Sequence, residues 1–457
     1  MNFTKLFNDK TFYRTMFKLA IPITLQNLIL SSLNLVDTIM IGKLGERAIA
    51  SVGLANQYFF LLNLLLFGIS SGASIFTAQY WGNRDIKNIR RVLGICLITG
   101  CIASFLFTIG GLLFPNQILS IFSKDMDVVL LGSKYLRIIV FSYVITAISF
   151  AYSFVLRSTG EVKTPMVVSI IALGTNTVFN YLLIYGKFGF PRLEVEGAAI
   201  ATVMARVLEM VLILYVVYKN NNVIAAKVSE MMDLSSSFIK NFFKVTTPVI
   251  LNESIWALGV TLYAVVYARM GTSVIASTNI SGTIEKIAWV IFMGLGNACA
   301  VMIGNKIGER DEENAFNYAK RFIILGPSLA VLAGFLVFLS SKWILSPYNV
   351  SAEVYEFSYK NLIVFAVFLW AKTFNYFSIV GILRSGGDTK FCLVIDTCGV
   401  WLVGVPLAFL GGLVWKLPIY WVLVLVYMEE VFKLILGLPR ILSKKWINNL
   451  TSEVNGE

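Results

Sequence analysis

The chain of 457 residues has no histidine and few charged residues. Without histidine, a His-ligated metal site and a Ser-His-Asp hydrolase are excluded, and any proton relay must use carboxylates. Charged residues make up 14% of the chain, against about 25% in soluble domains, and hydrophobic residues make up 57%. The composition therefore indicates an integral membrane protein.

Cysteine and acidic residues are also scarce. The five cysteines lie within predicted helices and show no Cys-x-x-Cys spacing, so they are interpreted as apolar packing residues. Lysine and arginine number 38 against 26 aspartates and glutamates, which gives a formal charge of +12. In a membrane protein this excess is expected beside the anionic inner leaflet, so no nucleic-acid partner is predicted.

Long apolar stretches are abundant. A helix needs about 20 apolar residues to cross a hydrocarbon core of about 30 Å. Twelve such stretches lie near residues 14–41, 50–80, 92–114, 133–156, 165–186, 195–218, 243–269, 273–304, 321–343, 357–383, 391–412 and 417–438.

The second half of the chain repeats the first. Pro22 and Gly68 recur as Pro248 and Gly294, a shift of 226 residues, and Arg157 recurs as Arg384 with a shift of 227. Six spans per repeat is an even number, so both repeats begin on the same side and are predicted to be parallel. The predicted domains are a six-helix lobe over residues 1–218, a cytoplasmic interlobe linker over 219–241, and a six-helix lobe with a short cytoplasmic tail over 242–457.

Basic residues predict the orientation of the chain. If the N-terminus is cytoplasmic, the inner segments hold 24 of the 38 basic residues, Lys433 among them, and the outer segments hold 11. Cytoplasmic segments of membrane proteins are enriched in lysine and arginine. We therefore expect both termini in the cytoplasm.

Polar residues line one face of the first span. Asn27, Ser31, Asn34, Asp37 and Thr38 follow three- and four-residue spacings, which place them on one side of a helix. A carboxylate within a membrane is costly and usually lines an ion or substrate path. Asp37 is therefore the first functional candidate, although it could instead be wetted or capped at the outer end of its helix.

Further polar residues lie in the fifth and sixth spans. Asn176 and Asn180 are four residues apart on one helical face, and the sixth span contributes Thr202. Interhelical amide hydrogen bonds are common structural contacts in membranes, so a structural role is equally open. Arg206 and Glu209 are predicted to form a structural pair.

The second repeat carries a different charged set. Glu253, Glu285, Lys372 and Asp396 lie within its predicted spans, where the first repeat has uncharged residues. Two interpretations remain open, a buried salt bridge that stabilises the lobe and a titratable cluster whose occupancy changes during transport. Glu253 lies about 15 Å into its helix, near the middle of the membrane, and is the preferred functional candidate.

An ordered set of motifs covers almost the whole chain. The motifs are Ile21-Pro22, Val36-Asp37-Thr38, Gly42-x-Leu44-Gly45, Ala78-Gln79-x-x-Gly82, Leu156-Arg157, Pro165-Met166, Gly197-Ala198-Ala199 and Leu383-Arg384-x-Gly386-Gly387-Asp388. In this order the motifs resemble the MATE (multidrug and toxic compound extrusion) transporters, especially the bacterial NorM- and DinF-like members.

The resemblance implies a fold, an activity and a site. It implies an all-α membrane protein of twelve transmembrane helices in two parallel repeats with V-shaped lobes. It also implies antiport of Na⁺ or H⁺ against cationic amphipathic compounds, with no other cofactor and with membrane lipids as surroundings. With this resemblance we expect a monomer in a bacterial inner (plasma) membrane. The cation site of the family's first lobe corresponds to Asp37, Asn176, Asn180 and Thr202, with Asp37 as a possible Na⁺ ligand. Its tenth-helix aspartate has no counterpart here, because Thr373 and Lys372 stand at that place.

Two alternatives to efflux remain. A flippase of the same superfamily would carry a lipid-linked oligosaccharide or a peptidoglycan precursor, but an anionic cargo favours a cationic cavity. The basic residues near midmembrane, Arg206, Lys286 and Lys372, each have an acidic residue nearby in sequence or in the same lobe. An integral-membrane enzyme such as an acyltransferase is disfavoured by the missing histidine and by the repeat.

Overall fold

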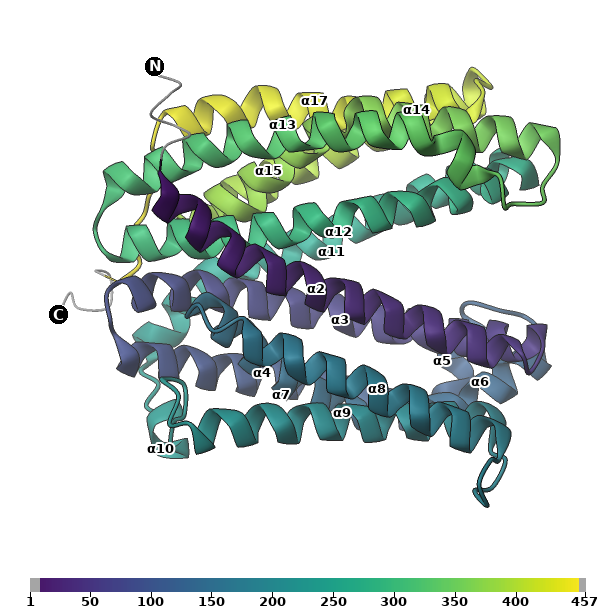
Figure 1. The fold of residues 1–457 in the computed structure, drawn as a ribbon, viewed down its shortest axis with the longest axis horizontal. Helices are drawn as coiled ribbons and strands as arrows, with labels where there is room; N and C mark the ends of the chain where they lie inside the picture. The colour runs from purple at the N-terminus through teal and green to yellow at the C-terminus, as the bar shows by residue number, and fades with distance from the viewer. Residues whose placement is uncertain (1–8, 452–457) are drawn as a thin grey trace. The chain divides into compact units, whose positions relative to one another are not determined.

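The protein is described from a computed structural model that covers residues 9–451, with the side chain of Asn34 excepted. Within these residues the chain forms helices and no strands (Figure 1). The first repeat contains α2 (Lys10–Gly42), α3 (Glu46–Gly82), α4 (Ile86–Leu113), α5 (Pro115–Ser120), α6 (Met126–Ile139), α7 (Phe141–Ser158), α8 (Lys163–Tyr185), α9 (Glu194–Lys219) and α10 (Val228–Met231). The second contains α11 (Ser236–Met270), α12 (Thr272–Gly308), α13 (Glu312–Leu345), α14 (Ala352–Tyr376), η1 (Phe377–Leu383), α15 (Thr389–Cys398), η2 (Gly399–Gly404), α16 (Val405–Phe409), η3 (Leu410–Val414) and α17 (Ile419–Leu442).

These helices confirm the predicted class, an all-α membrane protein with two six-helix repeats. Eleven helices within residues 9–451 are long and apolar enough to cross a membrane. The twelfth predicted span is α17, which carries Glu429, Glu430 and Lys433 along its otherwise apolar length. The predicted fourth span, 133–156, corresponds to two helices, because the chain turns at Val140 between α6 and α7.

The chain divides into two compact units whose boundaries lie inside helices. We call residues 25–250 the N-lobe, and residues 251–451 together with residues 9–24 the C-lobe. The boundaries fall in α2 and α11, two residues after Pro22 and Pro248, and are themselves 226 residues apart. The division therefore differs from the predicted one at residues 219–241, because each lobe includes the first turns of a helix that continues into the other lobe.

Glycines allow these first turns to pack closely. In the C-lobe, a Cβ on Gly294 would lie 2.9 Å from the carbonyl oxygen of Ala20. In the N-lobe, a Cβ on Gly68 would lie 2.9 Å from the Cα of Ile250. Gly68 and Gly294 are repeat equivalents, so the same contact holds α11 in one lobe and α2 in the other. The sequence repeat thus specifies a reciprocal exchange of helix ends.

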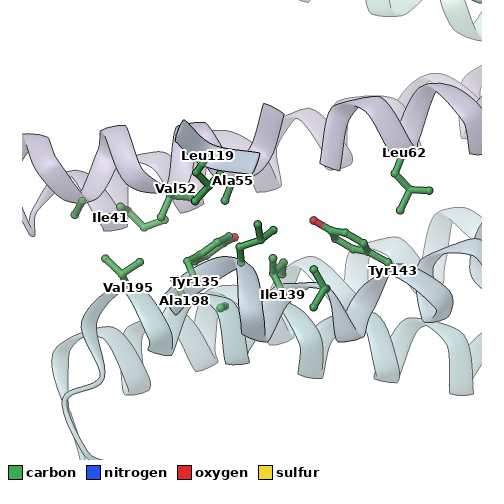
Figure 2. Packing of buried hydrophobic residues seen from close by; sticks show 14 of the residues in the cluster. Ile41, Val52, Ala55, Leu62, Leu119, Tyr135, Ile139, Tyr143, Val195 and Ala198 are labelled. Atoms are coloured by element: carbon green, nitrogen blue, oxygen red, sulfur yellow. The ribbon is translucent and has the colours of Figure 1, made fainter. Parts of the chain in front are cut away.

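The N-lobe contains a buried apolar cluster, formed largely by α3, α6 and α7 (Figure 2). Tyr135 and Ile139 from α6 and Tyr143 from α7 face Val52 and Leu62 from α3. Burial of an apolar or aromatic side chain of this size contributes roughly 1.5–3 kcal/mol. This packing fixes α2, α3 and α6 around the polar groups described below.

Short π-helical segments distinguish the C-lobe. The segment η1 ends directly before Arg384, and η2 begins three residues after Asp396, whereas residues 150–156 at the repeat position of η1 are regular α-helix. A π-turn inserts a residue, reorients the side chains beside it and is frequent at functional sites.

The segment between α9 and α11 is bound to the N-lobe. Arg90 of α4 contacts Glu230 at 2.6 Å, and Asp233 binds Arg91 and Lys87, the latter at 3.3 Å. The hydrogen bond from Arg91 lowers the pKa of Asp233. These ion pairs fix the segment that leads into α11.

An ion pair also anchors the start of α2 within the C-lobe. Asp9 binds Arg321 of α13 at 2.5 Å and accepts a hydrogen bond from the Phe12 amide at 2.9 Å. The bond from Arg321 holds the pKa of Asp9 below its ordinary value. We expect Asp9→Asn to lower unfolding stability by about 1 kcal/mol near pH 7, as loss of a charged helix cap does. The capping aspartate Asp85 of α4 lies in no such ion pair in the described structure, so Asp85→Asn is the matched control.

The difference between Asp9→Asn and the wild type should depend on pH. Because the pKa of Asp9 is lowered by folding, its contribution is complete above the ordinary aspartate pKa of about 4 and is lost as pH falls through the folded value. Thermal unfolding curves of the two proteins should therefore converge on strong acidification. Convergence already at pH 6 would show that the pair does not contribute in this way.

Candidate functional site

The four residues predicted for the N-lobe site lie in one hydrogen-bonded row. Asn180 donates through Nδ2 to Asp37 Oδ1 at 2.5 Å and to Asn176 Oδ1 at 3.0 Å. Asn176 Nδ2 in turn donates to Thr202 Oγ1 at 3.2 Å. The row therefore joins α2, α8 and α9 within the N-lobe.

Helix geometry explains the row. Asn176 and Asn180 are one turn apart on α8, so their side chains point from the same face, and both are fully buried. Thr202 Oγ1 also donates to the Ala198 carbonyl oxygen at 3.0 Å, which fixes the hydroxyl on α9. The four-residue spacing predicted that Asn176 and Asn180 share a face, and the family resemblance grouped them with Asp37 and Thr202. The role of the four residues as a cation site stays a prediction.

The chemistry of the row suits one positive charge. Asp37 is its single carboxylate, and Asn180 Oδ1 is buried without a hydrogen-bond donor among the described residues. A buried acceptor without a partner costs free energy that a proton donor or an alkali cation recovers. Residues 9–451 contain no group of three or more Asp, Glu, Cys or His side chains placed to hold a metal ion. The oxygens of Asp37, Asn176, Asn180 and Thr202 fit a monovalent ion rather than a multivalent one.

Asp37 also faces a cavity of about 530 Å³ inside the N-lobe. Its wall is mixed, with aromatic rings, amides, one carboxylate and one guanidinium. The lining residues are Leu33, Asp37, Thr38, Ile41, Ile49, Val52, Gly53, Asn56, Phe59, Phe60, Asn63, Tyr135, Ile139, Ser142, Thr202 and Arg206. A largely apolar cavity with a few polar groups is typical of sites for amphipathic small molecules.

Arg206, the one cation of this wall, is neutralised by Glu209. Their charged groups are 2.7 Å apart, as expected for the predicted structural pair. Ser169 Oγ donates to Glu209 Oε1 at 3.5 Å and accepts from Gln26 Nε2 at 3.0 Å. Gln26 Oε1 accepts from Arg157 Nη2 at 2.6 Å. A polar chain thus connects the cavity wall to the Leu156-Arg157 motif.

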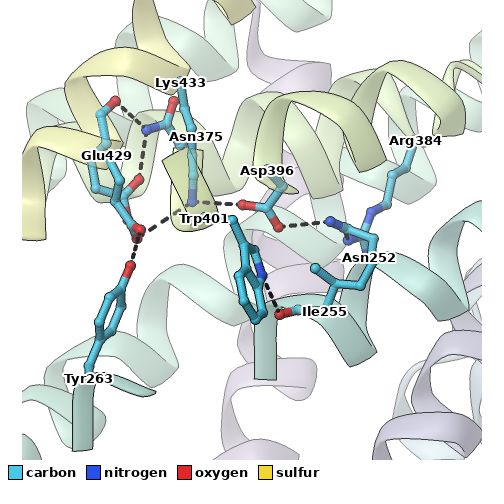
Figure 3. A network of polar contacts seen from close by, with 10 residues as sticks. Asn252, Ile255, Tyr263, Asn375, Arg384, Asp396, Trp401, Glu429 and Lys433 are labelled. Carbon is cyan, nitrogen blue, oxygen red and sulfur yellow. Dashed lines mark hydrogen bonds and ion pairs between the residues drawn. The ribbon is translucent and has the colours of Figure 1, made fainter. Parts of the chain in front are cut away.

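The charged residues predicted in the C-lobe do not form one cluster. Glu253 pairs with Arg384 at 2.7 Å. Asp396 pairs with Lys433 at 2.7 Å (Figure 3). Asn252 connects the two pairs, since it accepts from Arg384 and donates to Asp396 at 2.9 Å.

The other two predicted residues lie elsewhere in the C-lobe. Lys372 lies over the Trp289 ring, with its nitrogen 4.9 Å from the ring centroid. Glu285 has Lys372 and Tyr427 as neighbours. Thr373, next to Lys372, is fully buried on α14, and no carboxylate stands at this position.

Sequence reasoning missed the charged residues of α17. It counted Lys433 among the cytoplasmic residues, which is wrong, because the Lys433 side chain is 4% exposed and bonded within the lobe. Glu429 accepts from the Tyr263 hydroxyl at 2.5 Å, and Glu430 accepts from the Asn375 amide at 2.7 Å. Charged residues near the middle of an apolar span were a usable signal.

Comparisons with known proteins agree with this architecture. The sequence profile of the MatE family matches twice, at residues 22–182 and 248–410, which reproduces the repeat. A probable multidrug resistance protein NorM of Thermotoga maritima is 25% identical over 95% of this chain and 93% of its own. A probable multidrug resistance protein YoeA of Bacillus subtilis is 25% identical over 89% of this chain and 88% of its own.

Solved structures share the fold. A MOP superfamily transporter from Pyrococcus furiosus, described with a binding pocket of reverse polarity, matches with a TM-score of 0.85 at 21% identity, covering 94% of this chain and 96% of its own. An outward-facing multidrug resistance MATE transporter matches with a TM-score of 0.84 at 21% identity over the same shares. Because the family profile covers most of both repeats, the chain belongs to the MatE family of membrane transporters.

Proposed function

We propose that the protein is a secondary active multidrug efflux transporter that exchanges Na⁺ or H⁺ for cationic amphipathic compounds by alternating access. The names of the Thermotoga and Bacillus relatives support drug export. The observation that carries the proposal is a lone carboxylate, Asp37, on the wall of an amphipathic cavity and at the end of a buried amide row.

Competition for Asp37 is sufficient to couple the two fluxes. Arg206 is matched by Glu209, so the net negative charge of the cavity wall resides on Asp37. A drug cation and a coupling ion that neutralise the same carboxylate exclude each other, because the second arrival finds no net charge to bind. Linkage requires each to weaken the other by the same factor. Ion binding from outside then releases the drug outside.

Binding measurements on purified protein test this proposal. Ethidium or a rhodamine cation should bind more weakly when Na⁺ is raised or pH is lowered, by about 5- to 150-fold for a typical coupling free energy. A neutral dye of similar size is the control and should respond to neither. Indifference of the cations to both ions, or binding of anionic lipid-linked sugars alone, would replace the proposal by the flippase alternative.

We further propose a location and an orientation. The bacterial relatives favour a bacterial plasma membrane. The excess of basic residues in the inner segments, which persists without Lys433, favours both termini in the cytoplasm. In this proposal the coupling ion is cargo, no resident cofactor is needed, and the protein works as a monomer among membrane lipids.

Cysteine labelling checks the orientation. Asn221 is exposed in the segment after α9, and Phe188, between α8 and α9, is 87% exposed on the opposite side of the N-lobe repeat. In intact cells an impermeant maleimide should label Phe188→Cys and fail to label Asn221→Cys. The reverse pattern would invert the topology. Permeabilised cells, in which both variants should react, provide the control.

A further inference from the structure

The polar chain of the N-lobe has a counterpart in the C-lobe. Gln26 and Asn252 are repeat equivalents, as are Arg157 and Arg384, and in each lobe the arginine donates to the amide oxygen. In each lobe the amide nitrogen donates in turn to the next equivalent position, which is Ser169 in the N-lobe and Asp396 in the C-lobe.

The counterparts continue into the last helix of each repeat. The connection before α17, residues 415–418, is shorter than residues 186–193 before α9, so the shift falls to 224. With this shift six of the nine buried positions of α9 fall on buried positions of α17, and Glu209 corresponds to Lys433. Ser169 contacts Glu209 just as Asp396 contacts Lys433. Each lobe therefore contains an equivalent polar path. Its last residue is a carboxylate, Glu209, in the N-lobe and a cation, Lys433, in the C-lobe.

The two paths differ in charge balance. The N-lobe path contains two cations, Arg157 and Arg206, and two carboxylates, Asp37 and Glu209, and Arg206 is paired with Glu209. In the C-lobe, Arg384 and Lys433 are the cations of the path, and each contacts a carboxylate, Glu253 or Asp396, at 2.7 Å. The two adjacent carboxylates of α17, Glu429 and Glu430, are additional, so the carboxylates of this path outnumber its cations.

Glu429 and Glu430 are buried, and the one cation that forms an ion pair with either of them in the described structure, Lys433, is shared with Asp396. Their residues are 7% and 8% exposed. Lys433 Nζ is 3.6 Å from Glu429 Oε1, farther than from Asp396, to which it is bound. Tyr263 supplies a hydroxyl to Glu429 and Asn375 an amide to Glu430, and both donors are neutral. Two ionised carboxylates side by side in a lobe interior are strongly disfavoured, so one has to bind a positive charge.

The position of this surplus within the repeat is informative. Tyr263 is the repeat equivalent of Asp37, and Arg206 corresponds to Glu430. The place that holds the exchangeable carboxylate of the N-lobe thus holds the Tyr263–Glu429 hydrogen bond in the C-lobe. Glycine at position 404 leaves room for this bond, since a Cβ there would lie 2.5 Å from Glu429 Oε2.

From these contacts we propose that Glu429 and Glu430 of α17 form a proton-binding position, the C-lobe counterpart of Asp37. A proton fits better than an alkali cation, because Tyr263, Asn375 and Lys433 present hydrogen-bond donors to the two carboxylates rather than oxygen ligands. Water supplies the proton to a carboxylate oxygen, and the same proton returns to water when the site faces the other side. The proposal rests on the proposed antiport, which it extends to a second coupling group.

Neighbouring helices supply the other charged and titratable groups. They are Tyr263 and Tyr267 of α11, Glu285 of α12, Lys372 of α14, Asp396 of α15, and Tyr427 and Lys433 of α17. Lys372 is beside Glu285 and Lys433 is bound to Asp396, so neither cation is available to neutralise the surplus alone.

Infrared spectroscopy on the purified full-length protein tests the assignment directly. Over a pH titration, the wild type should show the carbonyl band of a buried carboxylic acid, and Glu429→Gln or Glu430→Gln should remove or shift it. Asp37→Asn should leave that band in place, because Asp37 lies in the other lobe. The exposed carboxylate Glu196 supplies a matched surface control, Glu196→Gln, which should also leave it unchanged.

A milder variant covers the case in which the glutamine variants fail to fold. Tyr263→Phe removes one donor from the Glu429 carboxylate and should move the disappearance of the band to higher pH. A band that neither the glutamine variants nor Tyr263→Phe alters would overturn the assignment.

Transport measured in parallel separates the two proposals. Export of cationic dyes by a wild type whose band is insensitive to Glu429 and Glu430 would refute the second proton position and leave the efflux proposal standing. A band assigned to α17 in a wild type that exports no cationic dye would refute the efflux proposal and leave the proton-binding position standing. If both hold, proton release on dye binding should fall by about half in Glu429→Gln, since one of two coupling groups is lost.

Discussion

Replacing Asp37 by asparagine should abolish gradient-driven efflux while the protein still folds and binds drug. The side chains are nearly isosteric, and the Asn180 amide, now 2.5 Å from Asp37 Oδ1, can still donate to the new amide oxygen, although to a neutral acceptor. The variant loses the negative charge for which drug and ion compete. We expect a loss of coupling of about 5- to 150-fold, the usual range for a coupling free energy of 1–3 kcal/mol. Dye efflux from proteoliposomes under separately imposed Na⁺ and pH gradients measures it.

A matched aspartate distinguishes coupling from general damage. Asp125 caps α6 through the amide of Asp127 at 3.0 Å and does not line the N-lobe cavity. Asp125→Asn should therefore leave efflux unchanged. If Asp37→Asn transports as well as Asp125→Asn does, Asp37 is a structural carboxylate and the coupling charge lies elsewhere.

The N-lobe row was accessible from sequence because spacing within one helix determines which side chains share a face. Asn176 and Asn180 are four residues apart, and this spacing alone predicts that both amides project from one side of their helix. The family resemblance then paired them with Asp37 and Thr202, and the structure shows this row. The repeat was likewise predictable from the duplicated motifs. The number of spans and the fold class were predictable from the lengths of the apolar stretches.

The C-lobe network was not accessible, because contacts between helices depend on rotation and depth that spacing does not specify. Glu253 and Arg384 are 131 residues apart in sequence, and η1 rotates the helix just before Arg384. Lys433 looked cytoplasmic because it lies near the end of its predicted span. The change of shift from 227 to 224 also hid the correspondence between Glu209 and Lys433. An alignment that allows for the shorter connection before α17 would have revealed it.

The exchange of helix ends between the lobes was also hidden. Sequence shows α2 and α11 as continuous apolar stretches, with only Pro22 and Pro248 to mark where each passes from one compact unit to the other. A proline within a helix removes one backbone hydrogen bond and commonly kinks it. It does not show which lobe each half packs against. That information lies in contacts such as the one at Gly294.

Replacing Arg384 by methionine should give the largest loss of stability in the C-lobe. The Arg384 side chain is 4% exposed and is the ion-pair partner of Glu253, so the variant leaves a carboxylate without its partner in the lobe interior. Removal of one partner of a buried pair typically costs 3–5 kcal/mol, or about 6–20 °C in melting temperature for a lobe of this size. Thermal unfolding of the purified protein in detergent, at one fixed scan rate, measures the shift.

The double variant Arg384→Met with Glu253→Gln separates the lost ion pair from the lost packing. It removes both charges, so it should recover most of the stability, since an uncharged buried pair avoids the desolvation cost. The repeat supplies a second comparison in Arg157→Met, whose arginine donates to the neutral amide of Gln26. In that variant the hydrogen bonds from Arg157 Nε and Nη2 to Gln26 Oε1 are lost, and loss of a charge-assisted hydrogen bond costs about 1.5–3 kcal/mol. If the single and double variants of Arg384 melt together, Glu253 is not left charged, and it would have to be included among the carboxylates that carry a proton in the C-lobe.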